Sequence, residues 1–161
     1  MEIDILMDSF ENTASELKRA EHSIYVSLKY TRTQDVLENI IERLTNTLSN
    51  LIEFLVLLKS EEPFPKNKKL DLFKEMYPDE IGKEILKYYN LLKVIKKRRK
   101  TVINQYRRHI KLVVELEPMI FYIVDLDSVE ENYKLIKGFV DYAHKLFLET
   151  KREELNNINL I

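Results

Sequence analysis

The trio Arg107-Arg108-His109 combines the residue types that acid–base chemistry on a phosphate ester requires. A histidine can act as general acid or base on an RNA phosphodiester, and an adjacent arginine stabilises the negative charge that develops. We therefore take His109 and Arg108 as candidate catalytic residues. The alternative is that His109 only begins a strand and faces water, because the sequence locates no partner for this imidazole.

The trio belongs to a stretch, 85–114, that has no Asp or Glu and holds ten of the 26 basic residues. The other 16 basic residues face 27 acidic ones, so the rest of the chain is acidic. Clustered cations bind phosphates through counterion release, and a nearby tyrosine can stack on a base. The alternative is a solvated helix end, whose cations face the negative end of the helix dipole or an acidic partner. The candidate ligand-binding residues are Lys96, Lys97, Arg98, Arg99, Lys100, Tyr106, Arg107 and Arg108.

Two further candidate ligand-binding residues, Arg19 and His22, lie in the first predicted helix. They are close in sequence and could line one cleft; a half-buried histidine bonded to a neighbouring acceptor is the structural alternative. The three histidines, spread from 22 to 144, form no metal-binding spacing, and there is no cysteine. The sequence also has no glycine-rich phosphate loop. We therefore expect neither a metal nor a cofactor.

Asp125 and Asp127 flank Leu126 and could hold Mg²⁺, because paired carboxylates are suitable ligands for this ion. We favour a structural role, in which Asp127 caps the last helix. Ser128 and Glu131 have the spacing of a capping box, which places the start of that helix here.

Apolar residues at three- and four-residue spacing predict four long helices. The second is the clearest, because its leucines repeat every 3.5 residues on average, as in the packing seam of a bundle or coiled coil. This seam fits an antiparallel bundle and a dimer interface equally well. The predicted helices span 4–30, 34–59, 79–99 and 128 onward, with a short helix at 71–77, a loop at 60–69 and a fraying tail at 151–161.

A change of period after Arg108 predicts a β-hairpin at about 109–126. Polar and apolar residues alternate from His109 to Glu117, and the following run is rich in β-branched and aromatic residues. The connecting Glu117-Pro118 lacks the glycine or asparagine of a common tight turn. The alternative is that the third helix continues through this stretch.

Together these elements predict one mainly α domain over 1–161: an up-and-down bundle of four long helices and one short helix, with the hairpin before the last helix. Two glycines and four prolines are too few for an all-β fold. No segment has the ~18 apolar residues that a membrane span requires. The N-terminus is acidic, whereas a signal peptide begins with basic residues. We therefore expect a cytoplasmic location and no membrane association.

The segment AEHSIYVSLKYTRT (20–33), together with Tyr106-Arg107-Arg108-His109, resembles a group of small archaeal proteins whose helical part is similar to HEPN-type bundles. The resemblance covers most of the chain. It implies an up-and-down bundle, often dimeric, that is associated with nucleotide or RNA binding and sometimes with RNA cleavage. The catalytic HEPN signature, an arginine followed four to six residues later by a histidine, is absent. Arg19 precedes His22 by three positions, and Arg99 precedes His109 by ten.

Three functions stay open on these observations. We favour a module that binds RNA, a nucleotide or another phosphate-bearing ligand through the basic stretch. The first alternative is a structural protein whose heptad seams form a homodimer or other homo-oligomer, or whose cations meet an acidic partner. The second is a metal-independent ribonuclease centred on His109. The missing signature makes binding the preferred prediction.

Overall fold

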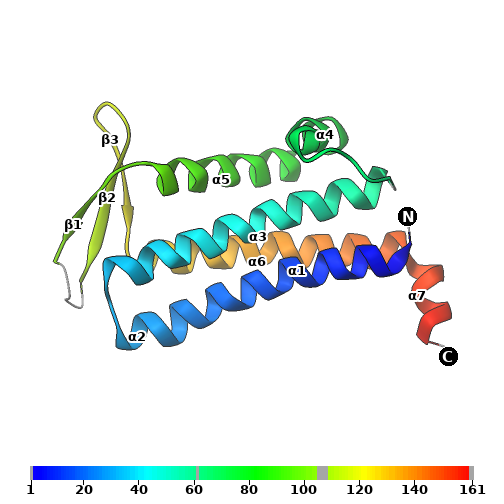
Figure 1. Cartoon of the computed structure of the whole chain (residues 1–161), viewed down its shortest axis with the longest axis horizontal. Coiled ribbons are helices and arrows are strands. Elements are labelled where there is room, and N and C mark those ends of the chain that lie inside the picture. Colours follow the sequence, from blue (N-terminus) through cyan, green and yellow to red (C-terminus); the bar gives the residue numbers. More distant parts are fainter. Residues whose placement is uncertain (1, 61, 105–108, 160–161) are drawn as a thin grey trace.

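Helices make up most of the chain, as predicted, and a small antiparallel sheet lies at one end of them (Figure 1). The computed structural model describes residues 2–60, 62–104 and 109–159. Its helices are α1 (Ile3–His22), the π turn η1 (Ser23–Ser27), α2 (Leu28–Tyr30), α3 (Gln34–Ser60), the 3₁₀ turn η2 (Lys66–Lys68), α4 (Lys69–Met76), α5 (Glu80–Lys97), α6 (Leu126–Thr150) and α7 (Arg152–Asn159). Its strands are β1 (Lys100–Ile103), β2 (Lys111–Glu117) and β3 (Ile120–Val124).

The predicted first helix is present as α1, η1 and α2, which follow one another without a gap. The π turn interrupts the α-helical pattern near the end of this segment, and π turns inside helices are frequent at functional sites. Ile24 within it is buried, whereas Tyr25 and Val26 are exposed. The backbone becomes extended at Thr31, and the hydroxyl of Thr33 accepts a 3.5 Å hydrogen bond from a backbone N–H in the first turn of α3.

Helix α3 packs against α1, α4, α5 and α6. The leucine-rich seam that could have served a bundle or a dimer lies in the hydrophobic core of the chain itself. Each of its members is at most 3% exposed: Leu37, Ile41, Leu44, Leu48, Leu51, Leu55 and Leu58. Burying one such side chain stabilises the fold by roughly 1.5–3 kcal/mol. The seam therefore holds the helices of one chain together.

The N-terminal caps of α5 and α6 fix where these helices begin. Asp79 caps α5 as predicted, its carboxylate accepting a 3.2 Å hydrogen bond from the backbone N–H of Gly82. The predicted cap of α6 at Asp127 is wrong by two positions. Asp125 is the cap, because its Oδ1 accepts from the N–H of Ser128 at 2.9 Å while the Ser128 hydroxyl accepts from the N–H of Asp125.

The predicted hairpin is confirmed as β2 and β3, and the alternative of a continuing third helix is wrong. Their connection places Met119 at a φ of 66°, a left-handed conformation in which glycine or asparagine is more usual. The sequence did not predict β1, which pairs with β2 and completes a sheet of order β1-β2-β3. Leu112, Val114 and Val124 are fully buried on the inner face of the sheet.

The segment expected to be a fraying tail contains α7, and Leu155 of this helix packs against the core. The loop expected at 60–69 contains fewer residues than predicted, because α3 extends to Ser60 and η2 begins at Lys66. None of the helices in the described ranges has an apolar stretch long enough to cross a bilayer.

Candidate functional site

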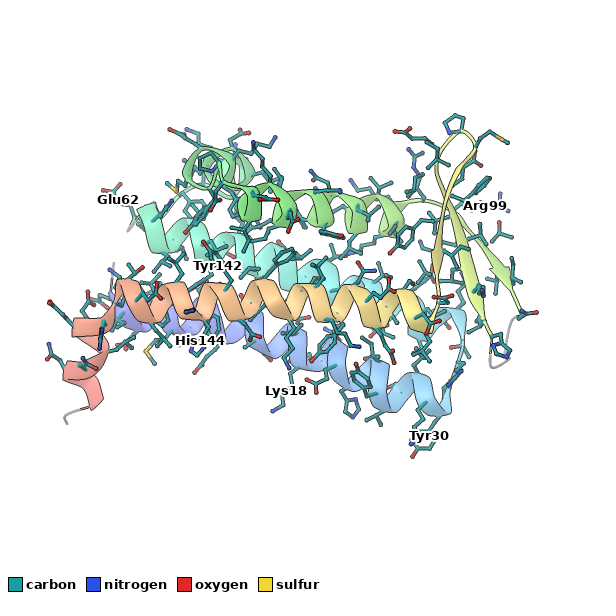
Figure 2. All side chains as sticks on the ribbon, turned by 180° about the vertical axis from the view of Figure 1, so that it is seen from behind. Lys18, Tyr30, Glu62, Arg99, Tyr142 and His144 are labelled. Carbon is teal, nitrogen blue, oxygen red and sulfur yellow. The ribbon has the colours of Figure 1, made fainter. Side chains whose placement is uncertain are left out.

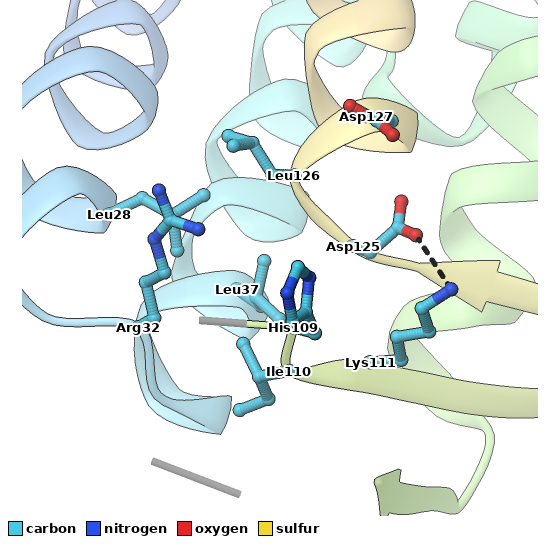
Figure 3. Close-up of a pocket in the computed structure, with 9 residues that line it drawn as sticks. All are labelled: Leu28, Arg32, Leu37, His109, Ile110, Lys111, Asp125, Leu126 and Asp127. Carbon is cyan, nitrogen blue, oxygen red and sulfur yellow. Dashed lines mark ion pairs between the residues drawn. The ribbon is translucent and has the colours of Figure 1, made fainter. Parts of the chain in front are cut away.

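A cavity of about 340 Å³ lies where the α2–α3 turn, the start of β2 and the start of α6 meet (Figure 3). Arg32 comes from the turn, His109 and Lys111 come from the start of β2, and Asp125 and Asp127 come from the start of α6. Leu28, Leu37, Ile110 and Leu126 provide the apolar part of the lining. The cavity therefore combines cationic, acidic and imidazole groups from three distant parts of the sequence.

Arg32 and His109 are 77 positions apart in sequence and line the same cavity. Leu28 and Leu37, on either side of Arg32 in sequence, are at most 1% exposed and fix the turn that carries the arginine. His109 lies just before β2, where its carbonyl oxygen accepts a 3.4 Å hydrogen bond from the side-chain amide of Asn104. The folded core thus holds a guanidinium and an imidazole at one site.

Asp125 performs two functions at this site. Its Oδ1 caps α6, while its Oδ2 lies 3.8 Å from the Lys111 ammonium, the ion pair drawn in Figure 3. The side chain of Lys111 is 44% exposed, so this pair is well solvated and contributes little to stability. Asp127 does not cap α6; its side chain is exposed and lines the same cavity.

The predicted basic stretch does not form one continuous set of free cations. Lys96 lies 3.5 Å from Glu42, and Lys100 lies 3.4 Å from Glu38. The Lys100 side chain is only 6% exposed, and its ammonium also donates to two carbonyl oxygens at the end of α5. Two members of the predicted ligand set thus join α5 and β1 to α3.

Lys97, Arg98 and Arg99 are exposed, and in the described ranges no ion pair is recorded for them. Arg98 and Arg99 line a second cavity of about 490 Å³, on the outer face of the sheet. The predicted residues Tyr106, Arg107 and Arg108 lie outside the described residues.

Arg19 and His22 do not join the predicted cations of α5. They belong to α1, which lies on the opposite side of the molecule from α5 (Figures 1 and 2). Arg19 pairs with Glu16 at 3.0 Å, one turn away on the same helix, and both Arg19 and His22 are exposed. Neither residue lines either of the two cavities described above, and both lie on a different side of the molecule from Lys96–Lys100.

Arg32 lies in the segment 20–33 but was not predicted as a site residue. Its position in the same cavity as His109 depends on the fold and leaves no spacing pattern in the sequence. Arg32 and His109 lie in 20–33 and 106–109, the two segments that were compared with HEPN-type proteins. In the described part of the chain, no three His, Asp or Glu side chains are grouped in a way that could hold a metal ion.

Comparison of this chain with protein-family models, with curated proteins and with solved structures gives no match.

Proposed function

We propose that the cavity between α2, β2 and α6 binds a phosphate group of RNA or of another phosphate-bearing ligand. The supporting observation is that Arg32 and His109 line one cavity together with Lys111. A guanidinium offers paired N–H donors that match phosphate oxygens, and an imidazole adds a further donor. Lys111 supplies a third donor if it exchanges its solvated contact with Asp125 for the ligand.

Exposed aromatic residues in the helical segment that precedes Arg32 favour RNA over a free phosphate ion. Tyr30 is 78% exposed and Tyr25 is 42% exposed, both on the segment that leads to Arg32. Figure 2 shows Tyr30 directed away from the helices at the end of the molecule that carries the sheet. The Lys29 ammonium lies 5.9 Å from the centroid of the Tyr30 ring. A base stacked on tyrosine contributes about 1–3 kcal/mol, and a nearby lysine can contact the adjacent phosphate.

The two acids at the cavity define which ligands fit. Asp125 and Asp127 repel a second phosphate placed against α6, whereas their oxygens can accept hydrogen bonds from ribose hydroxyls. We therefore infer a ligand with alternating anionic and hydroxyl groups, as in a ribonucleotide chain. The wider proposal includes a cytoplasmic protein in which α1, α3, α5 and α6 form a HEPN-like up-and-down bundle.

The test is the binding of a fluorescently labelled single-stranded RNA, measured by anisotropy at several salt concentrations. The variant R32Q/H109A should bind at least about tenfold more weakly, because a hydrogen bond to a charged group contributes roughly 1.5–3 kcal/mol. The salt dependence should also become shallower by about one phosphate contact. Arg152→Gln is the matched control: α7 lies at the opposite end of the molecule, so this variant should bind like the wild type (Figure 1). Wild-type protein with no affinity at low salt, or equal affinities for all three proteins, would refute the proposal.

The same juxtaposition gives RNA cleavage as a second candidate function. His109 could take the proton of a ribose 2′-hydroxyl, whose oxygen then bonds to the adjacent phosphorus while the bond from phosphorus to the 5′-oxygen breaks, giving a 2′,3′-cyclic phosphate. Arg32 would stabilise the charged phosphate, and water would supply a proton to the leaving 5′-oxygen. Chromatographic analysis of incubated RNA tests this candidate, because the H109A variant should lose any cleavage that the wild type shows. Cleavage that persists in H109A would assign the activity to another group or to a contaminant.

A further inference from the structure

The outer face of the sheet adjoins the cavity described above at Lys111, which lies on this face beside Ile103, but the apolar residues of the face do not line that cavity. Residues alternate between the two faces of a strand, so the buried Leu112 and Val114 place Val113 and Glu115 on the outer face. The register pairs Val113 with Thr101 of β1 and with Ile123 of β3. These three residues form a central row, with Ile103 and Phe121 on the same face.

This face and the adjoining β2–β3 turn concentrate apolar surface. In the described part of the chain, ten large hydrophobic side chains are exposed, and five of them belong to this small sheet and its turn. They are Ile103 (45%), Met119 (84%), Ile120 (52%), Phe121 (54%) and Ile123 (46%). Phe121 alone exposes about 100 Å², given the roughly 150–250 Å² of an aromatic side chain. Ile103, Phe121 and Ile123 lie on the outer face and Met119 lies in the adjoining turn, whereas Ile120 alternates to the other face of β3. The first four together expose a few hundred Å², about the size of the largest and often functional patch on a monomer.

Charges of both signs surround the apolar residues. Arg98 and Arg99 lie on one side of the 490 Å³ cavity next to Phe121, and Glu115 and Glu117 also line it. All four side chains are exposed, and in the described ranges no ion pair is recorded between these arginines and glutamates. Two arginines and two glutamates therefore lie beside one apolar patch.

We propose that this face binds a second copy of the chain in a two-fold homodimer. A two-fold axis brings the same patch of both copies together, so a self-complementary surface must carry both members of each charge pair. Arg98 and Arg99 of each copy then face the glutamates of the other, around a centre made of the apolar side chains. A nucleic acid fits this face less well, because its phosphates would leave the exposed side chains of Ile103, Phe121 and Ile123 without an apolar partner. The apolar patch, a few hundred Å² in size, supplies a large part of the roughly 800 Å² per partner in a standard interface.

The oligomeric state in solution tests this inference, and sedimentation equilibrium measures it without any RNA. Wild-type protein should sediment as a dimer, and Ile123→Lys should sediment as a monomer. Ile5→Lys is the matched control, because Ile5 is 49% exposed on α1, away from the sheet, and this variant should stay dimeric. A monomeric wild type, or a dimer that persists in I123K, would overturn the inference.

A charge exchange identifies the interface more specifically. The variants R98E/R99E and E115R/E117R should each be monomeric, because like charges would then face each other across the axis. Mixing the two should restore a heterodimer, detectable when one variant carries a mass tag. Two variants that stay dimeric alone, or a mixture that stays monomeric, would refute the facing charges. RNA affinity is measured separately on these proteins, so loss of the dimer and loss of the proposed function are distinguishable.

Discussion

Replacing Lys100 by methionine should lower stability without specifically weakening RNA binding. The Lys100 ammonium lies 3.0 Å from the carbonyl oxygen of Arg98, 3.3 Å from that of Lys96 and 3.4 Å from the carboxylate of Glu38. Methionine keeps the apolar stem, so the change removes mainly these polar contacts. A hydrogen bond to a charged group contributes roughly 1.5–3 kcal/mol, but water can replace the ammonium at these two carbonyls at the end of the helix, so we take about 1 kcal/mol for each, and the partly exposed ion pair contributes less. The expected loss in unfolding free energy is about 2 kcal/mol.

Thermal unfolding followed by circular dichroism measures this loss. For a chain of this length, about 2 kcal/mol corresponds to a fall in Tm of roughly 4–8 °C. Lys97→Met is the matched control, because Lys97 is exposed and no ion pair is recorded for it in the described ranges. Its Tm should stay close to that of the wild type. Both variants lose one positive charge, so their RNA affinities should be equal. Equal Tm values, or a much weaker RNA affinity for K100M, would refute the structural role.

The remaining predictions concern two glycines and a tyrosine. Gly82→Ala should destabilise by about 1–3 kcal/mol, since a Cβ there would lie 2.1 Å from the Tyr77 carbonyl oxygen. Gly138→Ala should stabilise by about 0.4–1 kcal/mol, because the added Cβ meets nothing within 4 Å, and urea titrations measure both changes. Burial, reinforced by the Glu21 carboxylate, raises the pKa of Tyr133 to about 12. The folded state therefore retains a proton that the unfolded state loses near pH 10, so this contribution to stability disappears between about pH 10 and 12. Glu21→Gln should lower the pKa of Tyr133 in an NMR titration, and an unchanged value would contradict the assigned cause.

Local pattern was sufficient for most of the helices and for the hairpin. The leucine repeat in 34–59 predicted α3, and the alternation after His109 predicted β2. Both patterns are visible in the sequence because an element that buries one face has apolar residues at regular intervals. The strand β1 was missed because its four residues, KTVI, are too few to show a period. The cap of α6 was misplaced because Asp125 and Asp127 are both suitable capping residues, and only the backbone geometry selects the first.

The candidate site was only partly predictable, because it depends on contacts between distant segments. Residue type identified His109, but its proximity to Arg32 follows from how the α2–α3 turn meets β2. The pairing of Lys96 with Glu42 and of Lys100 with Glu38 joins residues more than fifty positions apart. No rule of spacing within a helix predicts such pairs. Charge segregation along the chain was therefore a poor guide to free charge on its surface.

The π turn at Ser23–Ser27 sets the direction in which the following residues face. An α-helix advances about 100° per residue, so one residue accommodated in a wider turn rotates everything after it by about that angle. Tyr30 and Arg32 both follow this turn. Deleting one residue from it would restore regular α-helical winding and turn Tyr30, the last residue of α2, to another side of the helix axis. The number of residues in this first helical segment therefore sets the direction in which Tyr30 faces and the point from which the chain turns towards Arg32.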